Sequence, residues 1–89
     1  MDITIKTLSQ KELENLGVFD WPLWEKEVSS FPWEYSDTES CYILQGEVTV
    51  TPKDGQPVNI KPGDFVVFPA GMQCQWDIKT PIRKHYSFG

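Results

Sequence analysis

Residues 63–71, Gly-Asp-Phe-Val-Val-Phe-Pro-Ala-Gly, combine two turns with a short apolar strand between them. Glycine adopts positive φ at little cost, so Gly63 and Gly71 favour tight turns at the two ends of the stretch. Pro69 fixes its own φ and donates no backbone hydrogen bond, which ends the strand. The four consecutive apolar residues 65–68 are typical of a strand buried inside a small barrel. The stretch therefore predicts one strand of an all-β fold.

Short strands separated by turns account for most of the chain on either side of this stretch. The other expected strands cover residues 3–6, 31–36, 40–44, 47–50, 58–60, 73–79 and 82–88. Strands at this close spacing are typical of an all-β barrel or jelly roll.

The N-terminal region contains the signals of one short helix followed by an aromatic segment. Ser9 and Glu12 have the spacing of a capping box, and Gly17 is placed to end the helix that they begin. Pro22 lies in the aromatic segment 19–24 and argues against a central strand there. We therefore expect this segment to be an arm packed over the sheet.

Length and composition predict a single domain, residues 1–89, with residues 1–30 forming the strand, helix and arm and residues 31–89 the barrel core. Four Trp, five Phe and three Tyr supply apolar surface for that core. Two cysteines do not make a disulfide framework. Cys41 and Cys74 are expected to be buried thiols, and a disulfide between them is the less favoured alternative.

The acidic balance of the chain argues against a nucleic-acid partner. There are 13 Asp and Glu against 8 Lys and Arg, a net charge of −5. Binding to phosphates needs clustered basic side chains, and the densest basic cluster here is only residues 83–85. No apolar run approaches the ~18 residues of a membrane helix, and the N-terminus lacks a signal-peptide pattern. We therefore expect a cytoplasmic protein with no membrane partner.

Two sequence patterns resemble the signatures of the cupin superfamily, the RmlC-like jelly rolls. The second signature is G, five residues, P-x-G, two residues, H, three residues, N. Gly63, Pro69 and Gly71 are in register with it, whereas Cys74 stands at the histidine and Ile78 at the asparagine.

The first signature is H-x-H, three or four residues, E, six residues, G. Glu39 and Gly46 match its last two positions, and Trp33 and Tyr35 stand at the two histidines. The resemblance implies a small β-barrel with a lumen. It also implies that the usual metal site of three histidines and one glutamate is missing, and with it dioxygenase chemistry.

A narrower resemblance covers most of the chain. The patterns Trp-Pro-x-Trp-Glu at 21–25, Glu-Ser-Cys-Tyr-Ile-Leu-x-Gly at 39–46, Phe-Pro-x-Gly at 68–71 and Arg-Lys-x-Tyr at 83–86 are similar to those of small single-domain cupins. These cupins are grouped with ureidoglycine aminohydrolase-like proteins, and most of them have no assigned activity.

The resemblance implies that the signature positions face the lumen, and alternation of side chains along the strands extends this set to their neighbours on the same face. The inward set on the earlier strands is Trp33, Tyr35, Glu39, Cys41, Cys74 and Trp76. On the last strand, alternation leaves two sets open, Lys84 with Tyr86 or Arg83 with His85 and Ser87. The Lys-x-Tyr pattern of the narrower resemblance favours Lys84 and Tyr86.

The chemistry of these residues leaves three functions open. In the favoured one, the lumen binds a small polar molecule without a metal, and Lys84 is the counter-ion of Glu39. The alternative is an aminohydrolase-like enzyme that uses Glu39 and Cys74, either as a thiol-assisted enzyme or with zinc held by Glu39, Cys74, Cys41 and His85. That metal set requires His85 to face inward. The third is a structural or interaction module, in which the arm at 21–24 joins two copies of the chain, so a homodimer is plausible.

Overall fold

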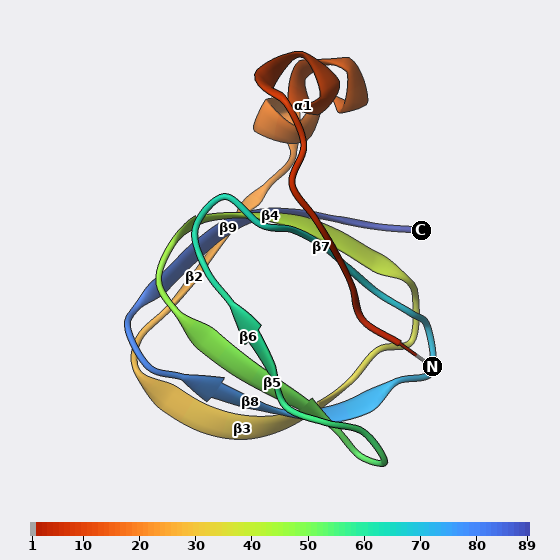
Figure 1. The fold of residues 1–89 in the computed structure, drawn as a ribbon, viewed down its shortest axis with the longest axis vertical. Coiled ribbons are helices and arrows are strands. Elements are labelled where there is room, and N and C mark those ends of the chain that lie inside the picture. The colour runs from red at the N-terminus through yellow and green to blue at the C-terminus, as the bar shows by residue number, and fades with distance from the viewer. Residues whose placement is uncertain (1) are drawn as a thin grey trace.

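Two antiparallel sheets face each other and together surround the lumen of a barrel (Figure 1). The computed structural model describes residues 2–89. In spatial order, the first sheet consists of β1 (Thr4–Lys6), β7 (Phe65–Phe68), β4 (Glu39–Gln45), β9 (Ile82–Phe88) and β2 (Leu23–Lys26). The second consists of β3 (Ser29–Glu34), β8 (Gln73–Ile78), β5 (Val48–Pro52) and β6 (Val58–Ile60). This is the all-β jelly roll that the sequence predicts.

Residues 63–71 form strand β7 between two turns. Gly63 and Gly71 have φ of 92° and 87°, in the left-handed region that favours glycine. Within β7 the side chains alternate, so Val66 and Phe68 face the lumen and are fully buried. Phe65 instead joins a second, smaller core on the outer face of the sheet. One continuous apolar run therefore supplies both cores.

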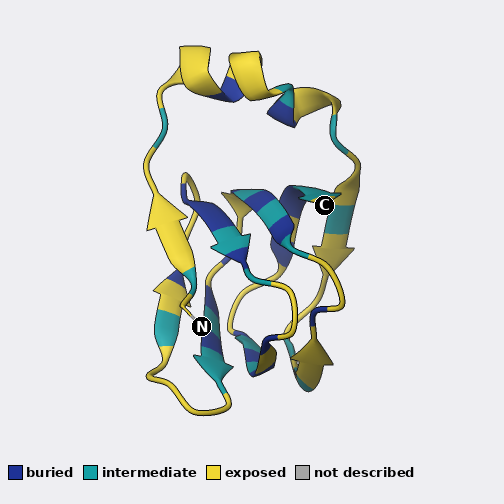
Figure 2. Ribbon diagram, turned by 90° about the vertical axis from the view of Figure 1, so that its right-hand side faces the viewer, coloured by how far each residue is buried: buried dark blue, intermediate teal, exposed yellow. Residues whose placement is uncertain are grey.

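The N-terminal segment builds that smaller core. Helix α1 (Gln10–Leu16) begins at the capping box of Ser9 and Glu12 and ends at Gly17, as the sequence predicts. A short 3₁₀ helix, η1 (Val18–Asp20), follows, and Val18 is fully buried. Figure 2 shows α1 at one end of the molecule, mostly exposed and joined to the barrel by two chain segments.

The aromatic segment 19–24 differs in part from the prediction. Residues 19–24 are not wholly an arm, because β2 begins at Leu23 and pairs with β9 in the first sheet. Pro22 lies just before the strand, where its missing N–H disturbs no ladder, and β2 is an edge strand. Pro32 lies inside β3, which is likewise an edge strand. The two edges β2 and β3 lie on the same side of the lumen (Figure 1).

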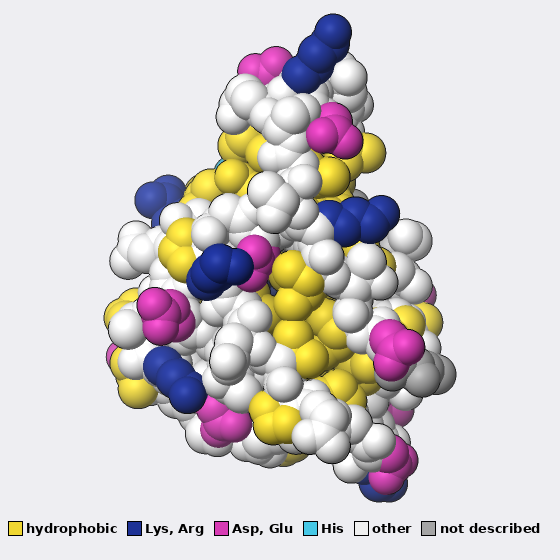
Figure 3. Space-filling view, viewed as in Figure 1, with side chains coloured by type: hydrophobic (Ala, Val, Ile, Leu, Met, Phe, Trp, Pro, Cys, Tyr) yellow, Lys and Arg dark blue, Asp and Glu magenta, His cyan; other side chains and the backbone are white. Residues whose placement is uncertain are grey.

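Among residues 2–89, no helix has the length and apolar character needed to cross a membrane. Figure 3 shows the molecule from the side of Figure 1, with apolar side chains visible over the middle of the barrel and charged ones around them.

Candidate functional site

A buried ion pair lies at the side of the lumen next to the edge strands. The Nζ of Lys84, on β9, lies 2.5 Å from Oε2 of Glu39, on β4. Each side chain is only 5% exposed. Isolated buried charges are very costly, so two of them are tolerated here because each is the partner of the other.

Two tryptophans surround the same ammonium. The Lys84 Nζ lies 5.0 Å from the ring centroid of Trp24 and 4.8 Å from that of Trp76. Indole faces attract a cation through their negative π surface. The ammonium is therefore held by one carboxylate and two aromatic faces. Trp24 reaches this position because it is paired with Lys84 in the β2–β9 register.

Aromatic rings form a wall beside the ion pair. Tyr35 stacks on Phe68 with ring centroids 4.8 Å apart, and Phe31 is stacked parallel to Trp76 at 6.1 Å. The indole N–H of Trp76 donates a hydrogen bond of 3.2 Å to the Tyr35 hydroxyl. Burial is the main reason that the pKa of Tyr35 lies above its usual range, so this hydroxyl stays protonated.

A small cavity of about 40 Å³ lies between the ion pair and this wall. It is lined by Trp24, Phe31, Trp33, Tyr35, Glu39, Trp76 and Lys84. Sites for drug-sized ligands enclose roughly 300–1,000 Å³, so this space is large enough only for a few atoms. Its walls are mostly aromatic, with the Lys84–Glu39 pair as the charged part of the lining.

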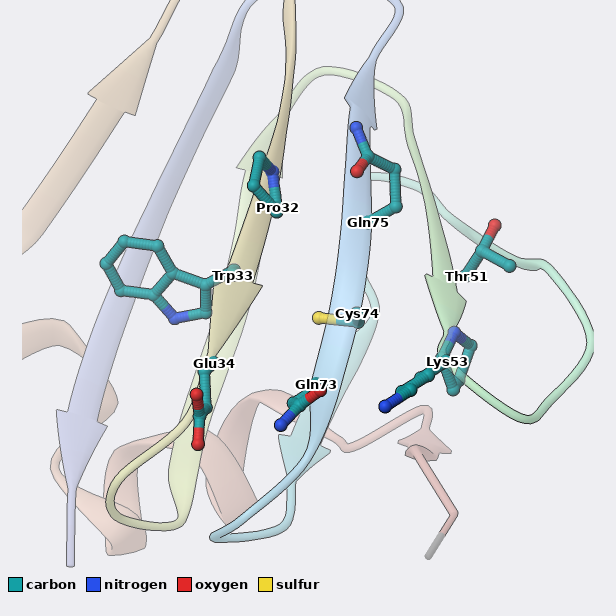
Figure 4. A pocket seen from close by; sticks show the side chains of 9 residues that line it. Pro32, Trp33, Glu34, Thr51, Lys53, Gln73, Cys74 and Gln75 are labelled. Atoms are coloured by element: carbon teal, nitrogen blue, oxygen red, sulfur yellow. The ribbon is translucent and has the colours of Figure 1, made fainter.

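A wider, open groove of about 590 Å³ lies over β3, β8 and β5 (Figure 4). Three consecutive residues from each strand line it: 32–34 on β3, 73–75 on β8, and 51–53 on and just after β5. Trp33 lines both this groove and the small cavity.

The two cysteines differ in position, and both are free thiols. Cys41 is fully buried in the main core, and burial raises the pKa of its thiol to about 12. Cys74 is 7% exposed and lines the open groove, and burial raises its pKa as well. Thiols with raised pKa values are weak nucleophiles at neutral pH.

His85 is the sole histidine of the chain and faces away from the lumen. Its Nδ1 lies 2.9 Å from the backbone oxygen of Trp21, to which it donates, and its ring packs edge-on against Phe19. The structure therefore does not bring His85 together with Glu39 as the zinc alternative requires. Within residues 2–89, no three His, Cys, Asp or Glu side chains are grouped closely enough to hold a metal ion.

Five of the residues predicted to face the lumen line the small cavity: Trp33, Tyr35, Glu39, Trp76 and Lys84. Of the others, Cys41 lies in the core, Cys74 lies at the groove, and Tyr86 is half-buried and packed against the core. The cavity also includes Trp24 and Phe31, which sequence reasoning missed. Alternation from Trp33 would have found Phe31, whereas Trp24 needed the β2–β9 pairing.

The two-sheet jelly roll with its enclosed lumen defines a protein of the cupin class. The chain belongs to the family of EutQ-like cupin domains, whose model matches residues 13–86. None of the curated proteins matches this chain.

Solved structures agree with this assignment. A DUF861 family protein from Thermotoga maritima is 45% identical, with a TM-score of 0.97, over 99% of this chain and 100% of that one. A putative ethanolamine utilization protein Q from Salmonella typhimurium shares the fold at 19% identity and a TM-score of 0.67, over 99% of this chain and 69% of that one. The EutQ protein of Clostridium difficile does so at 21% identity and a TM-score of 0.68, over 97% and 66% of the two chains.

Proposed function

We propose that this protein binds a small polar organic molecule of no net charge in the cavity beside Lys84 and Glu39. The observation that carries the proposal is the buried ion pair at the wall of an otherwise aromatic cavity. Such a wall offers a ligand both a hydrogen-bond donor and an acceptor, while the rings hold its flat faces.

Charge balance supports a ligand without net charge. Lys84 and Glu39 neutralise each other, so a lone anion or cation beside them would leave one buried charge without a partner, which is costly. A neutral group with an adjacent donor and acceptor, such as a primary amide, satisfies both side chains and leaves the balance unchanged.

Cavity size supports a small ligand, or a small head group on a larger one. About 40 Å³ accepts only a few atoms beside the ion pair. The half-exposed indole of Trp33 forms the wall nearest to solvent, so a larger ligand would extend past it.

The aminohydrolase-like alternative has less support. It assigns chemistry to Glu39 and Cys74, but Cys74 is not among the residues that line the cavity with Glu39. Its thiol is also protonated at neutral pH because burial raises its pKa. The narrower resemblance to ureidoglycine aminohydrolase-like cupins stays a prediction.

Three probes of similar size and different charge test the proposal: acetamide, acetate and methylammonium. We expect acetamide, at a dissociation constant of about 1 mM or weaker, to shift the NMR signals of the Trp24 and Trp76 indole N–H groups. Equal concentrations of acetate and methylammonium should leave those signals in place. Equal shifts from all three probes, or from none, would refute the proposal.

A variant pair links the binding to the ion pair. The double variant Glu39→Leu/Lys84→Met removes both charges together and avoids an unpaired buried ion. It should lose the response to acetamide. Lys61→Met is the matched control, because it removes an exposed lysine that does not line the cavity, and it should keep the response.

A further inference from the structure

Tyr35, one of the residues that line the small cavity, is held in place by both its backbone and its ring. Its backbone N–H donates a hydrogen bond of 2.9 Å to the carbonyl oxygen of Met72, and its own carbonyl oxygen accepts one of 2.6 Å from the N–H of Gly71. The ring stacks on Phe68, and the residue is almost completely buried. A hydroxyl that is fixed in advance loses little conformational freedom when a ligand binds to it.

The Tyr35 hydroxyl uses only one side of its hydrogen-bonding capacity. A phenol oxygen can accept a hydrogen bond, and its O–H can donate one. The indole N–H of Trp76 donates to the oxygen over 3.2 Å. Trp76 is the only hydrogen-bond partner of this hydroxyl among residues 2–89, and an indole N–H cannot accept a hydrogen bond. The O–H of Tyr35 is therefore a donor without an acceptor in the protein.

The surroundings of this hydroxyl place it beside the cavity. Trp76 and Glu39 line the same cavity as Tyr35. Burial and, after it, the negative charge of Glu39 raise the pKa of the Tyr35 hydroxyl, so the hydroxyl and the carboxylate are within electrostatic reach of each other. The unused O–H is thus available to a molecule that occupies the space between these side chains.

The Glu39 carboxylate also has one unused atom. Lys84 donates to its Oε2, and no group of residues 2–89 donates a hydrogen bond to Oε1. In the same part of the chain, no side-chain nitrogen or oxygen is both completely buried and without a hydrogen-bond partner. Oε1 is therefore accessible to a small molecule, and an ionised carboxylate oxygen can only accept. The cavity wall presents a free donor at Tyr35 and a free acceptor at Glu39.

We infer that Tyr35 is a ligand-selecting residue, which donates its O–H to a carbonyl oxygen while Oε1 of Glu39 accepts from an N–H of the same molecule. This inference rests on the proposed binding function and narrows the ligand class to amides that keep at least one N–H. A ligand that can only accept leaves Oε1 without a donor, and one that can only donate leaves the Tyr35 O–H without an acceptor.

The first experiment combines Tyr35→Phe with a change of the acceptor atom in the probe. Acetamide and thioacetamide carry the same N–H groups, but sulfur is a much weaker acceptor than oxygen. NMR titrations give the dissociation constants of both probes for both proteins. We expect Tyr35→Phe to weaken acetamide binding about three- to tenfold and thioacetamide binding less than about twofold, because only acetamide loses a strong hydrogen bond.

Tyr42→Phe is the matched control. It removes the same hydroxyl from a tyrosine that packs against the smaller core on the outer face of the first sheet, so it should change neither affinity. If acetamide binds the wild type but Tyr35→Phe weakens both probes equally, or neither, the inference is overturned and the proposed binding function stands. If acetamide does not bind the wild type, both are wrong.

The second experiment uses the wild-type protein alone, so it does not depend on the folding of Tyr35→Phe. A hydroxyl that donates becomes a better acceptor, because successive hydrogen bonds polarise one another. Saturating acetamide should therefore move the Trp76 indole proton downfield, and by more than saturating thioacetamide does. Equal shifts from the two probes would contradict the role of Tyr35.

Acetone tests the part of Glu39. It matches acetamide in size and has the carbonyl oxygen, but it has no N–H to donate to Oε1. We expect acetone to bind the wild-type protein at least about tenfold more weakly than acetamide, because a hydrogen bond to a charged acceptor is lost. Acetone binding as tight as that of acetamide would overturn the pairing of a ligand N–H with Glu39.

Discussion

Two neighbouring residues of β9, Arg83 and Lys84, each pair with a glutamate, but on opposite faces of the sheet. Arg83 Nε lies 3.1 Å from Oε1 of Glu25, with side chains 48% and 65% exposed. Lys84 Nζ lies 2.5 Å from Glu39, with both side chains 5% exposed. The two pairs have the same charges, and the largest difference between them is access to water.

That difference changes what each pair contributes. An exposed pair gains typically 0–1 kcal/mol, because water and salt screen it. A buried pair gives up hydration worth several kcal/mol per ion, so it adds little net stability. Removing only one of its partners is nevertheless strongly destabilising, because the other charge stays buried without a counter-charge. Stability alone therefore does not account for the Lys84–Glu39 pair, and its place at the cavity wall agrees with a role in orienting a ligand.

The largest expected effect comes from breaking the buried pair on one side. Glu39→Gln leaves the Lys84 ammonium without a counter-charge in the lumen, so we expect a loss of about 3–5 kcal/mol in the free energy of unfolding. Urea denaturation monitored by tryptophan fluorescence measures this.

The double variant Glu39→Leu/Lys84→Met is the control for that experiment. It replaces both charges by apolar groups, so it should recover most of the lost stability. A single variant that costs less than about 1 kcal/mol would mean that the pair is hydrated, which would remove the contrast with Arg83 and Glu25.

A smaller effect should appear in the dependence of stability on pH. Burial raises the pKa of the Cys41 thiol from its ordinary value of 9.0 to about 12, and this residue lies on the same lumen face as Lys84. Because the folded pKa is higher than the unfolded one, the contribution is fully present below pH 9 and is lost as pH rises toward 12. At pH 11 the loss should be about 2–3 kcal/mol.

Comparison with Cys41→Ala isolates this contribution. The variant has lower stability at pH 7 because it loses buried volume, but its stability should fall less steeply than that of the wild type between pH 9 and pH 11. Urea denaturation at four pH values across that range gives the two slopes. Parallel slopes would mean that the lumen around Cys41 is open to water.

Much of the fold was predictable because it depends on local rules. Glycine and proline positions define the turns around β7, and the capping box at Ser9 defines the start of α1. The spacing of the cupin signatures then placed Trp33, Tyr35 and Glu39 in the lumen, and alternation along β8 from Cys74 added Trp76. Each of these inferences uses residues that are close together in the sequence.

The remaining features depend on pairing between distant strands. Alternation on β9 did not decide between Lys84 and His85 as the inward residue, because both neighbouring faces of this strand are covered. The outer face lies under Phe19 and Trp21, which both contact His85 there. Trp24 was missed for the same reason, since its contact with Lys84 depends on the pairing of β2 with β9.

The smallest expected effect comes from breaking the exposed ion pair of Arg83 and Glu25. Arg83→Met removes the partner of Glu25 but leaves both sites hydrated, so the change in the free energy of unfolding should be about 0–0.5 kcal/mol. Half a molar sodium chloride should reduce even that difference, because the Debye length falls well below its value of about 10 Å at 0.1 M. Lys84→Met, one residue further along, should cost several times as much at either salt concentration, because it leaves Glu39 buried and unpaired. If the two variants lost equal free energy of unfolding, the face of the sheet on which a charged side chain lies would not determine the effect of removing it. A much larger loss for Lys84→Met would attribute the effect to the exclusion of water from the lumen.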